Sequence, residues 1–172
     1  MKWVNVVVDG STRAGLVEDG QIRLTAADDV RQVLSDLSKA AESAGEGGQI
    51  SLEDAHILQP ILRPGKILGI GLNYAAHAKE SVSFMKNTAP AVQKWFNKQP
   101  TAANGPYANV DLPSVSEQLD YEAEIVAVIG KTGRHVPEDR AWEMVAGLCC
   151  GCDFSVRDWQ RASQTMIMGK GF

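Results

Sequence analysis

The sequence lacks a long hydrophobic run. No apolar stretch approaches the roughly 20 residues that a helix needs to cross a bilayer, which excludes a membrane-spanning protein. The apolar run at residues 4–8 is interrupted by Asn5 and is followed by Asp9, so it is too short for the core of a signal peptide. We therefore expect no membrane partner.

An excess of positive charge is also absent. The chain has 17 Lys and Arg against 21 Asp and Glu, a net charge of −4, so it cannot replace the counterions of nucleic-acid phosphates. No nucleic-acid partner is expected. Hydrophobic residues make up 44% of the 172 positions, which is enough for a folded core and argues against disorder. The length suits one domain, or a small domain joined to part of a larger one.

Cysteines are few and crowded together. Cys149, Cys150 and Cys152 are odd in number and adjacent, whereas a disulfide framework needs pairs spread along the chain. Their spacing does not suit a zinc site either, so we interpret them as core thiols in a strand. A reducing, cytoplasmic location is expected.

The patterning predicts two regions. Residues 1–60 form a small unit, and residues 61–172 form a second one after a stiff, proline-flanked entry loop. The first region combines alternating apolar residues with one amphipathic 3-and-4 pattern, and the second is mostly strand-like. The expected strands cover 4–8, 14–17, 21–25, 66–70, 95–98, 121–129 and 147–153, the expected helices cover 28–44 and 137–145, and 81–106 is a long loop.

Two glutamates interrupt the strand expected over 121–129. Glu122 and Glu124 are two residues apart, so their side chains share one face of a strand. A pair of neighbouring carboxylates repel each other unless a cation lies between them, and oxygen ligands suit Mg²⁺, Mn²⁺ or Ca²⁺. From the pattern alone, an exposed edge strand with two solvated glutamates explains the pair equally well.

Two further features carry candidate chemistry. Asp153 ends a buried strand, where it serves either as a helix cap or as a metal ligand. His77 and Glu80 are three residues apart and share a helix face. A carboxylate beside a histidine raises its basicity, so this pair can activate water, although an exposed helix pair without a role has the same spacing.

A series of short motifs, taken in order, is more specific than any one of them. These are Arg63-Pro64-Gly65-Lys66-Ile67, Gly71-Leu72-Asn73-Tyr74 with His77 and Glu80, Leu112-Pro113, Leu119-Asp120-Tyr121-Glu122-Ala123-Glu124, Val128-Ile129-Gly130, Cys152-Asp153-Phe154-Ser155-Val156-Arg157-Asp158 and Gly169-Lys170. This series resembles the fumarylacetoacetate hydrolase family. The resemblance implies an α+β fold: a small N-terminal α/β domain over 1–60, then a mainly β, mixed-sheet roll over 61–172.

The resemblance also implies roles for particular residues. Three carboxylates match the family's metal ligands, for Mg²⁺ or Mn²⁺, and one His–Glu pair and one lysine match its active-site groups. The metal ligands would be Glu122, Glu124 and Asp153, and the catalytic residues His77, Glu80 and Lys170. The implied activity is that of a hydrolase or lyase that cleaves a C–C bond in a 2-oxo acid or 1,3-dicarbonyl substrate. The resemblance also implies a homodimer. Decarboxylation, isomerisation or sugar-acid dehydration within the family, or an inactive remnant, are the alternatives.

The sequence departs from the family pattern at two points. Some members carry a fourth carboxylate seven residues before the histidine, where this chain has Ile70, so three protein ligands are expected. The chain also stops at Phe172, immediately after the lysine motif, whereas the family's catalytic domain normally continues with a β-rich segment. We therefore expect an incomplete roll with unpaired strand edges.

Overall fold

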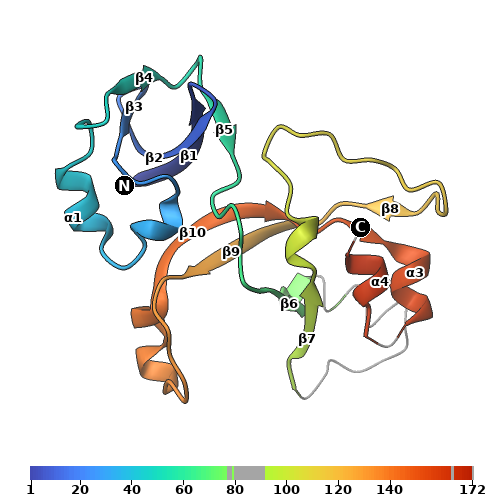
Figure 1. Cartoon of the computed structure of the whole chain (residues 1–172). Coiled ribbons are helices and arrows are strands. Elements are labelled where there is room, and N and C mark those ends of the chain that lie inside the picture. Colours follow the sequence, from blue (N-terminus) through green and yellow to red (C-terminus); the bar gives the residue numbers. More distant parts are fainter. Residues whose placement is uncertain (77–78, 80–91, 164, 172) are drawn as a thin grey trace. The chain divides into compact units, whose positions relative to one another are not determined.

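The structure is a computed structural model that describes residues 1–76, 79, 92–163 and 165–171 (Figure 1). It divides into two compact units. Unit 1 comprises Met1–Arg63, Ala103–Val110 and Ala123–Cys152, and unit 2 comprises the described residues of Pro64–Ala102, Asp111–Glu122 and Asp153–Phe172. Strands dominate and helices are short, which confirms the expected α+β class. No helix in the described part of the chain is long and apolar enough to cross a bilayer.

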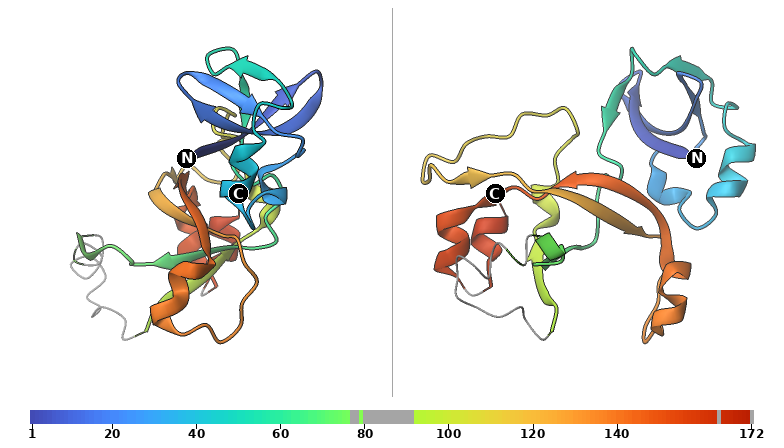
Figure 2. Two further views of the ribbon diagram at one scale, coloured as in Figure 1. Left: turned by 90° about the vertical axis from the view of Figure 1, so that its left-hand side faces the viewer. Right: turned by 180° about the vertical axis from the view of Figure 1, so that it is seen from behind.

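A five-stranded antiparallel sheet forms the main body of unit 1, and Figure 2 shows its strong curvature. Two tight hairpins build it, at Asp9-Gly10 and Asp19-Gly20, where both residues of each turn have positive φ. Val6, Ile22 and Leu24 form its buried core. The strand order is β4 (Gln49–Ser51), β3 (Gln21–Leu24), β2 (Ser11–Glu18), β1 (Lys2–Val8) and β5 (His56–Leu58).

The helix expected over 28–44 is wrong in extent. Two short elements replace it, a 3₁₀ helix at Val30–Gln32 and α1 (Leu37–Glu42). Each begins at its own aspartate, since Asp29 accepts a hydrogen bond from Arg31 N and Asp36 accepts one from Lys39 N. A cap inside the pattern ends one helix and starts another, which the apolar spacing alone does not reveal.

A long antiparallel hairpin completes unit 1. It pairs β9 (Ala123–Ile129) with β10 (Val145–Cys152), and in both views of Figure 2 it curves as a two-stranded ribbon. The segment expected to be an α-helix before β10 is a 3₁₀ helix, Glu138–Met144. Within the described residues this sheet contains no third strand, and several of its apolar side chains are exposed: Ile125, Val126, Ile129 and Leu148.

Unit 2 combines two small antiparallel sheets with two short helices. β6 (Ile67–Gly71) pairs with β7 (Lys94–Lys98), and β8 (Leu119–Asp120) pairs with β11 (Ser155–Val156). The helices α3 (Arg157–Ala162) and α4 (Ile167–Lys170) lie side by side (Figure 1). Gly169 permits this contact, because a Cβ there would come within 2.2 Å of Gln160 N. These elements bring the polar side chains of the candidate site together.

Candidate functional site

A short strand pair brings Glu122 and Asp153 together, although 31 positions separate them in sequence. Asp120 of β8 lies opposite Ser155 of β11 in the ladder. Just beyond the ladder, Asp153 N donates a 2.8 Å hydrogen bond to the carbonyl oxygen of Glu122. The backbone of unit 2 therefore fixes the starting points of both carboxylate side chains.

Lys170 lies between these two carboxylates. Its Nζ is 2.7 Å from Asp153 Oδ2 and 3.1 Å from Glu122 Oε2. The residue is only 2% exposed, and Nζ stands 4.8 Å from the ring centre of Phe96 in β7. A buried ammonium is tolerated when paired charges surround it, so Lys170 and the carboxylates hold one another in place.

A second lysine reaches Asp153 from β7. Lys98 Nζ lies 2.7 Å from Asp153 Oδ1 and 2.9 Å from the carbonyl oxygen of Phe154. The side chains of Lys98 and Asp153 are 13% and 10% exposed, so solvent screens this ion pair weakly. Both carboxylate oxygens of Asp153 therefore have an ammonium partner.

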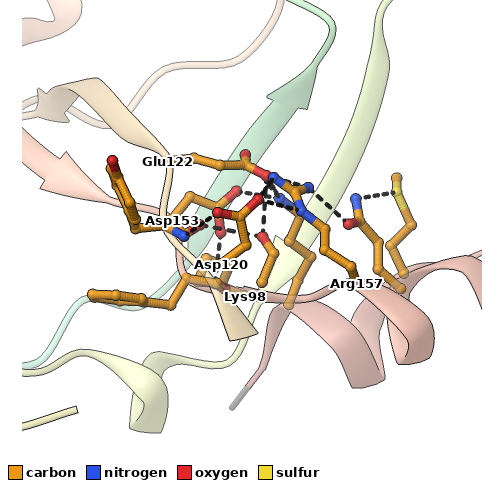
Figure 3. Close-up of polar contacts among 11 residues, drawn as sticks. Lys98, Asp120, Glu122, Asp153 and Arg157 are labelled. Atoms are coloured by element: carbon orange, nitrogen blue, oxygen red, sulfur yellow. Dashed lines mark hydrogen bonds and ion pairs between the residues drawn. The ribbon is translucent and has the colours of Figure 1, made fainter. Parts of the chain in front are cut away.

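Arg157, the first residue of α3, connects the remaining acidic groups. Its Nη1 lies 2.5 Å from Glu122 Oε1, and its Nη2 lies 2.8 Å from Asp120 Oδ2. The Ser155 hydroxyl, fully buried, donates a further 3.2 Å hydrogen bond to Glu122 Oε1. Figure 3 shows Arg157 of α3 pointing toward Asp120 of β8 and toward Glu122.

The charges of this cluster balance. Three carboxylates, of Asp120, Glu122 and Asp153, face three cations, of Lys98, Arg157 and Lys170. The hydrogen bond from Arg157 lowers the pKa of the Asp120 carboxyl. Burial works against the charged form of Arg157, yet its contacts with Asp120 and Glu122 leave its pKa raised overall. Both groups therefore stay ionised near neutral pH.

The structure brings some of the site residues predicted from the sequence together, but not all of them. Glu122, Asp153 and Lys170 lie in direct contact in unit 2. Glu124 belongs to β9 of unit 1, half-buried and opposite Gly151. His77 and Glu80 lie outside the described residues. Asp153 does not cap α3, which has no side-chain cap, so the capping interpretation is not supported.

Two contacting residues escaped the sequence interpretation. The sequence places Lys98 in an expected strand, as a candidate for lining the substrate pocket but not as a catalytic or metal-binding residue, and it places Arg157 in a motif without a role. A signal for Arg157 existed, because it follows Asp153 by four positions at the start of a helix. Lys98 gave none, since only the pairing of β6 with β7 and the packing of α4 against β7 bring it to Asp153.

The donor chemistry fits a hard divalent cation in part. Two carboxylates, of Glu122 and Asp153, already converge on one positive charge, the ammonium of Lys170. Such oxygen donors suit Mg²⁺ or Mn²⁺. Among the side chains that the structure describes, no group of three or more His, Cys, Asp or Glu is arranged to hold a metal ion. A metal site here therefore needs at least one further ligand beside this pair.

The sequence and the fold match a known class of proteins. The sequence model of the family described as fumarylacetoacetate (FAA) hydrolase C-terminal matches residues 66–172. This match covers more than half of the chain, so the chain belongs to the fumarylacetoacetate hydrolase family, and the resemblance of its motifs is confirmed.

The names of individual relatives describe different activities. The chain is 39% identical over 117 residues to the mitochondrial oxaloacetate tautomerase Fahd2a of Rattus norvegicus, covering 67% of this chain and 36% of the relative. Two solved structures match all of this chain and 62% of their own, each at 28% identity and a TM-score of 0.80. They are a fumarylacetoacetate hydrolase of Exiguobacterium antarcticum and a 5-carboxymethyl-2-hydroxymuconate delta-isomerase of Mycobacterium smegmatis. The chain thus spans about a third of the rat protein's length.

Proposed function

We propose that this chain provides the metal-binding carboxylates of an enzyme that acts on 2-oxo acids or 1,3-dicarbonyl compounds. The proposed reaction is cleavage of a C–C bond next to a carbonyl group, by a hydrolase or lyase mechanism, with Mg²⁺ or Mn²⁺ as the cofactor. The observation that carries this proposal is the convergence of Glu122 and Asp153 around one cation, beside Lys98 and Arg157. Family membership supports it, since the fumarylacetoacetate hydrolase named above has the same fold.

The chemistry follows from the charges in the cluster. When bound, a divalent cation supplies Lewis-acid stabilisation to negative charge that develops on a substrate oxygen. Glu122 and Asp153 would hold that cation, with Glu124 as the third expected ligand. Lys170, held rigidly by its buried contacts, would add a fixed positive charge beside the same oxygens. Lys98 and Arg157 are suited to bind substrate carboxylates, because both side chains are basic and carry hydrogen-bond donors.

The proton-transfer groups come from the family resemblance. His77 would deprotonate water for attack on a carbonyl carbon, and Glu80 would orient its ring and raise its basicity. Both residues lie outside the described part of the chain, so this role rests on the motif alone. The homodimer implied by the resemblance is likewise a proposal.

A second candidate function is keto–enol tautomerisation of a 2-oxo acid. The specific observation in its favour is the oxaloacetate tautomerase among the relatives, at 39% identity. An isomerase among the solved structures points to the same proton-transfer chemistry. Tautomerisation moves a proton between carbon and oxygen without breaking a C–C bond. The cations of the cluster would stabilise the developing enolate charge, and the His77–Glu80 pair would carry the proton between the two atoms.

Calorimetric titration of Mn²⁺ and Mg²⁺ into the 172-residue chain tests the proposed metal site. We expect saturable one-site binding that is lost in Glu122→Gln, because the substitution removes a ligand charge without changing its shape. Glu143→Gln is the matched control, since Glu143 is exposed and its ion pair within the described residues, with Arg140, lies away from the cluster. Equal affinity in wild type and Glu122→Gln would contradict the assignment.

Two assays on oxaloacetate and an acylpyruvate then distinguish the candidate reactions. Ultraviolet absorbance follows the decay of the conjugated enol, and product analysis by mass spectrometry detects C–C cleavage. Enol decay without cleavage products would favour tautomerisation over hydrolysis. Cleavage products that depend on added Mn²⁺ would favour the hydrolase or lyase.

A further inference from the structure

Asp153 has no free carboxylate oxygen. Lys98 Nζ lies 2.7 Å from Oδ1, and Lys170 Nζ lies 2.7 Å from Oδ2. A metal ion bound to either oxygen would lie close to one of these ammonium groups, and the two positive charges would repel each other. A divalent cation that approaches Asp153 therefore has to compete with at least one of the two lysines.

We propose that Lys98 is the resident counter-ion of Asp153, that a divalent metal displaces it, and that Lys98 thereby sets the metal affinity of the site. This inference rests on the proposed metal site described above. Without metal, Lys98 removes the electrostatic cost of a nearly buried carboxylate. With metal bound, the cation and the Lys98 ammonium would compete for Asp153, and the Lys98 ammonium is the group that can move away.

The contacts of the two lysines decide which of them moves. Lys170 is the more fixed, because it contacts Glu122 as well as Asp153, is 2% exposed and packs over the Phe96 ring. Lys98 contacts Asp153 alone among the carboxylates in the described residues, and its side chain is 13% exposed. Displacing Lys98 therefore breaks one ion pair, whereas displacing Lys170 breaks two.

The carbonyl oxygen of Phe154 keeps the displaced group close. It accepts a 2.9 Å hydrogen bond from Lys98 Nζ, independent of the Asp153 contact. The ammonium can therefore give up the carboxylate and still satisfy part of its hydrogen-bonding requirement. Lys98 would then be available for a substrate carboxylate when the metal is in place.

Metal affinity measured on Lys98→Met tests the inference. We expect the Kd for Mn²⁺, measured by calorimetry, to fall roughly 10- to 100-fold, which corresponds to losing one charge-assisted hydrogen bond as a competitor. Lys94→Met is the matched control, since Lys94 is an exposed residue of the same strand, and its Kd should equal that of wild type. If Lys98→Met does not fold, Lys98→Gln replaces it, because the amide keeps a donor for the Phe154 carbonyl.

Urea unfolding supplies a second readout that a merely structural role would not reproduce. Without metal, in the presence of a chelator, Lys98→Met should unfold at lower urea than wild type. Saturating Mn²⁺ should remove that difference, because the metal then neutralises Asp153. A variant with an unchanged or weaker Kd for Mn²⁺, and therefore destabilised at least as much with Mn²⁺ as without it, would overturn the inference while leaving the metal site intact. Absence of Mn²⁺ binding to wild type would overturn the proposed metal site and this inference together.

Discussion

The ring of Phe96 occupies the space that a side chain at Gly69 would fill. The two residues lie opposite each other in the β6–β7 ladder, and a Cβ on Gly69 would come within 2.2 Å of Phe96 Cζ. Phe96 is nearly buried and also lies beneath the ammonium group of Lys170, 4.8 Å from its ring centre. Because Gly69 has no side chain, the Phe96 ring can lie where it helps to hold Lys170 of the candidate site in place.

We expect Gly69→Ala to destabilise the protein by about 1–3 kcal/mol, because an added methyl group forces the Phe96 ring out of its position. Urea unfolding monitored by circular dichroism measures the effect. Gly65→Ala is the control, since a Cβ at Gly65 meets nothing within 4 Å. Equal unfolding midpoints for the two variants would show that the ring accommodates the methyl group freely.

Asn5 organises the loop beneath the sheet of unit 1. It is fully buried, its Oδ1 accepts a 2.8 Å hydrogen bond from Val30 N, and its Nδ2 donates to the carbonyl oxygens of Gln59 and Pro60. Asn5→Ala leaves these backbone groups without their partner, so we expect a loss of about 3 kcal/mol in the free energy of unfolding.

Chemical denaturation measures the loss. Asn104→Ala, which removes two exposed hydrogen bonds, to Asn109 O and from Gly105 N, should change the free energy little. A comparable loss in both variants would contradict the assignment.

The pKa of Asp158 supplies a pH-dependent prediction. The Ser116 hydroxyl donates a 2.8 Å hydrogen bond to Asp158 Oδ1, and this bond lowers the pKa of the carboxyl below its ordinary value of 3.8. A lowered folded-state pKa stabilises the protein above pH 3.8, and that contribution disappears as the pH falls through the folded-state value. Ser116→Ala should therefore raise the pKa of Asp158, as followed by carboxyl NMR.

The same variant should show a particular pattern in stability. The difference in free energy of unfolding between wild type and Ser116→Ala should be constant near neutral pH and should shrink in the acid range below 3.8. A difference that stays constant across the acid range would mean that the Ser116 hydroxyl contributes no charge-dependent stabilisation.

Local patterning was enough to predict most strands. Alternating valines before Asp9-Gly10 predicted β1 through the strand period of two. The β-branched and aromatic residues around Glu124 predicted β9 through their preference for strands. The helices were harder. The apolar spacing over 28–44 concealed two separate caps, at Asp29 and Asp36, whose effect depends on the local backbone geometry.

The sequence by itself determined the family, through motifs such as Asp120-Tyr121-Glu122-Ala123-Glu124 and Cys152-Asp153, and it identified Glu122, Asp153 and Lys170 as candidates. Only the tertiary structure decided which groups surround them. Lys98 and Arg157 meet Asp153 and Glu122 through the pairing of short strands and the packing of α3 and α4. Those contacts join residues as many as 55 positions apart, and no local periodicity specifies an ion pair over such a separation.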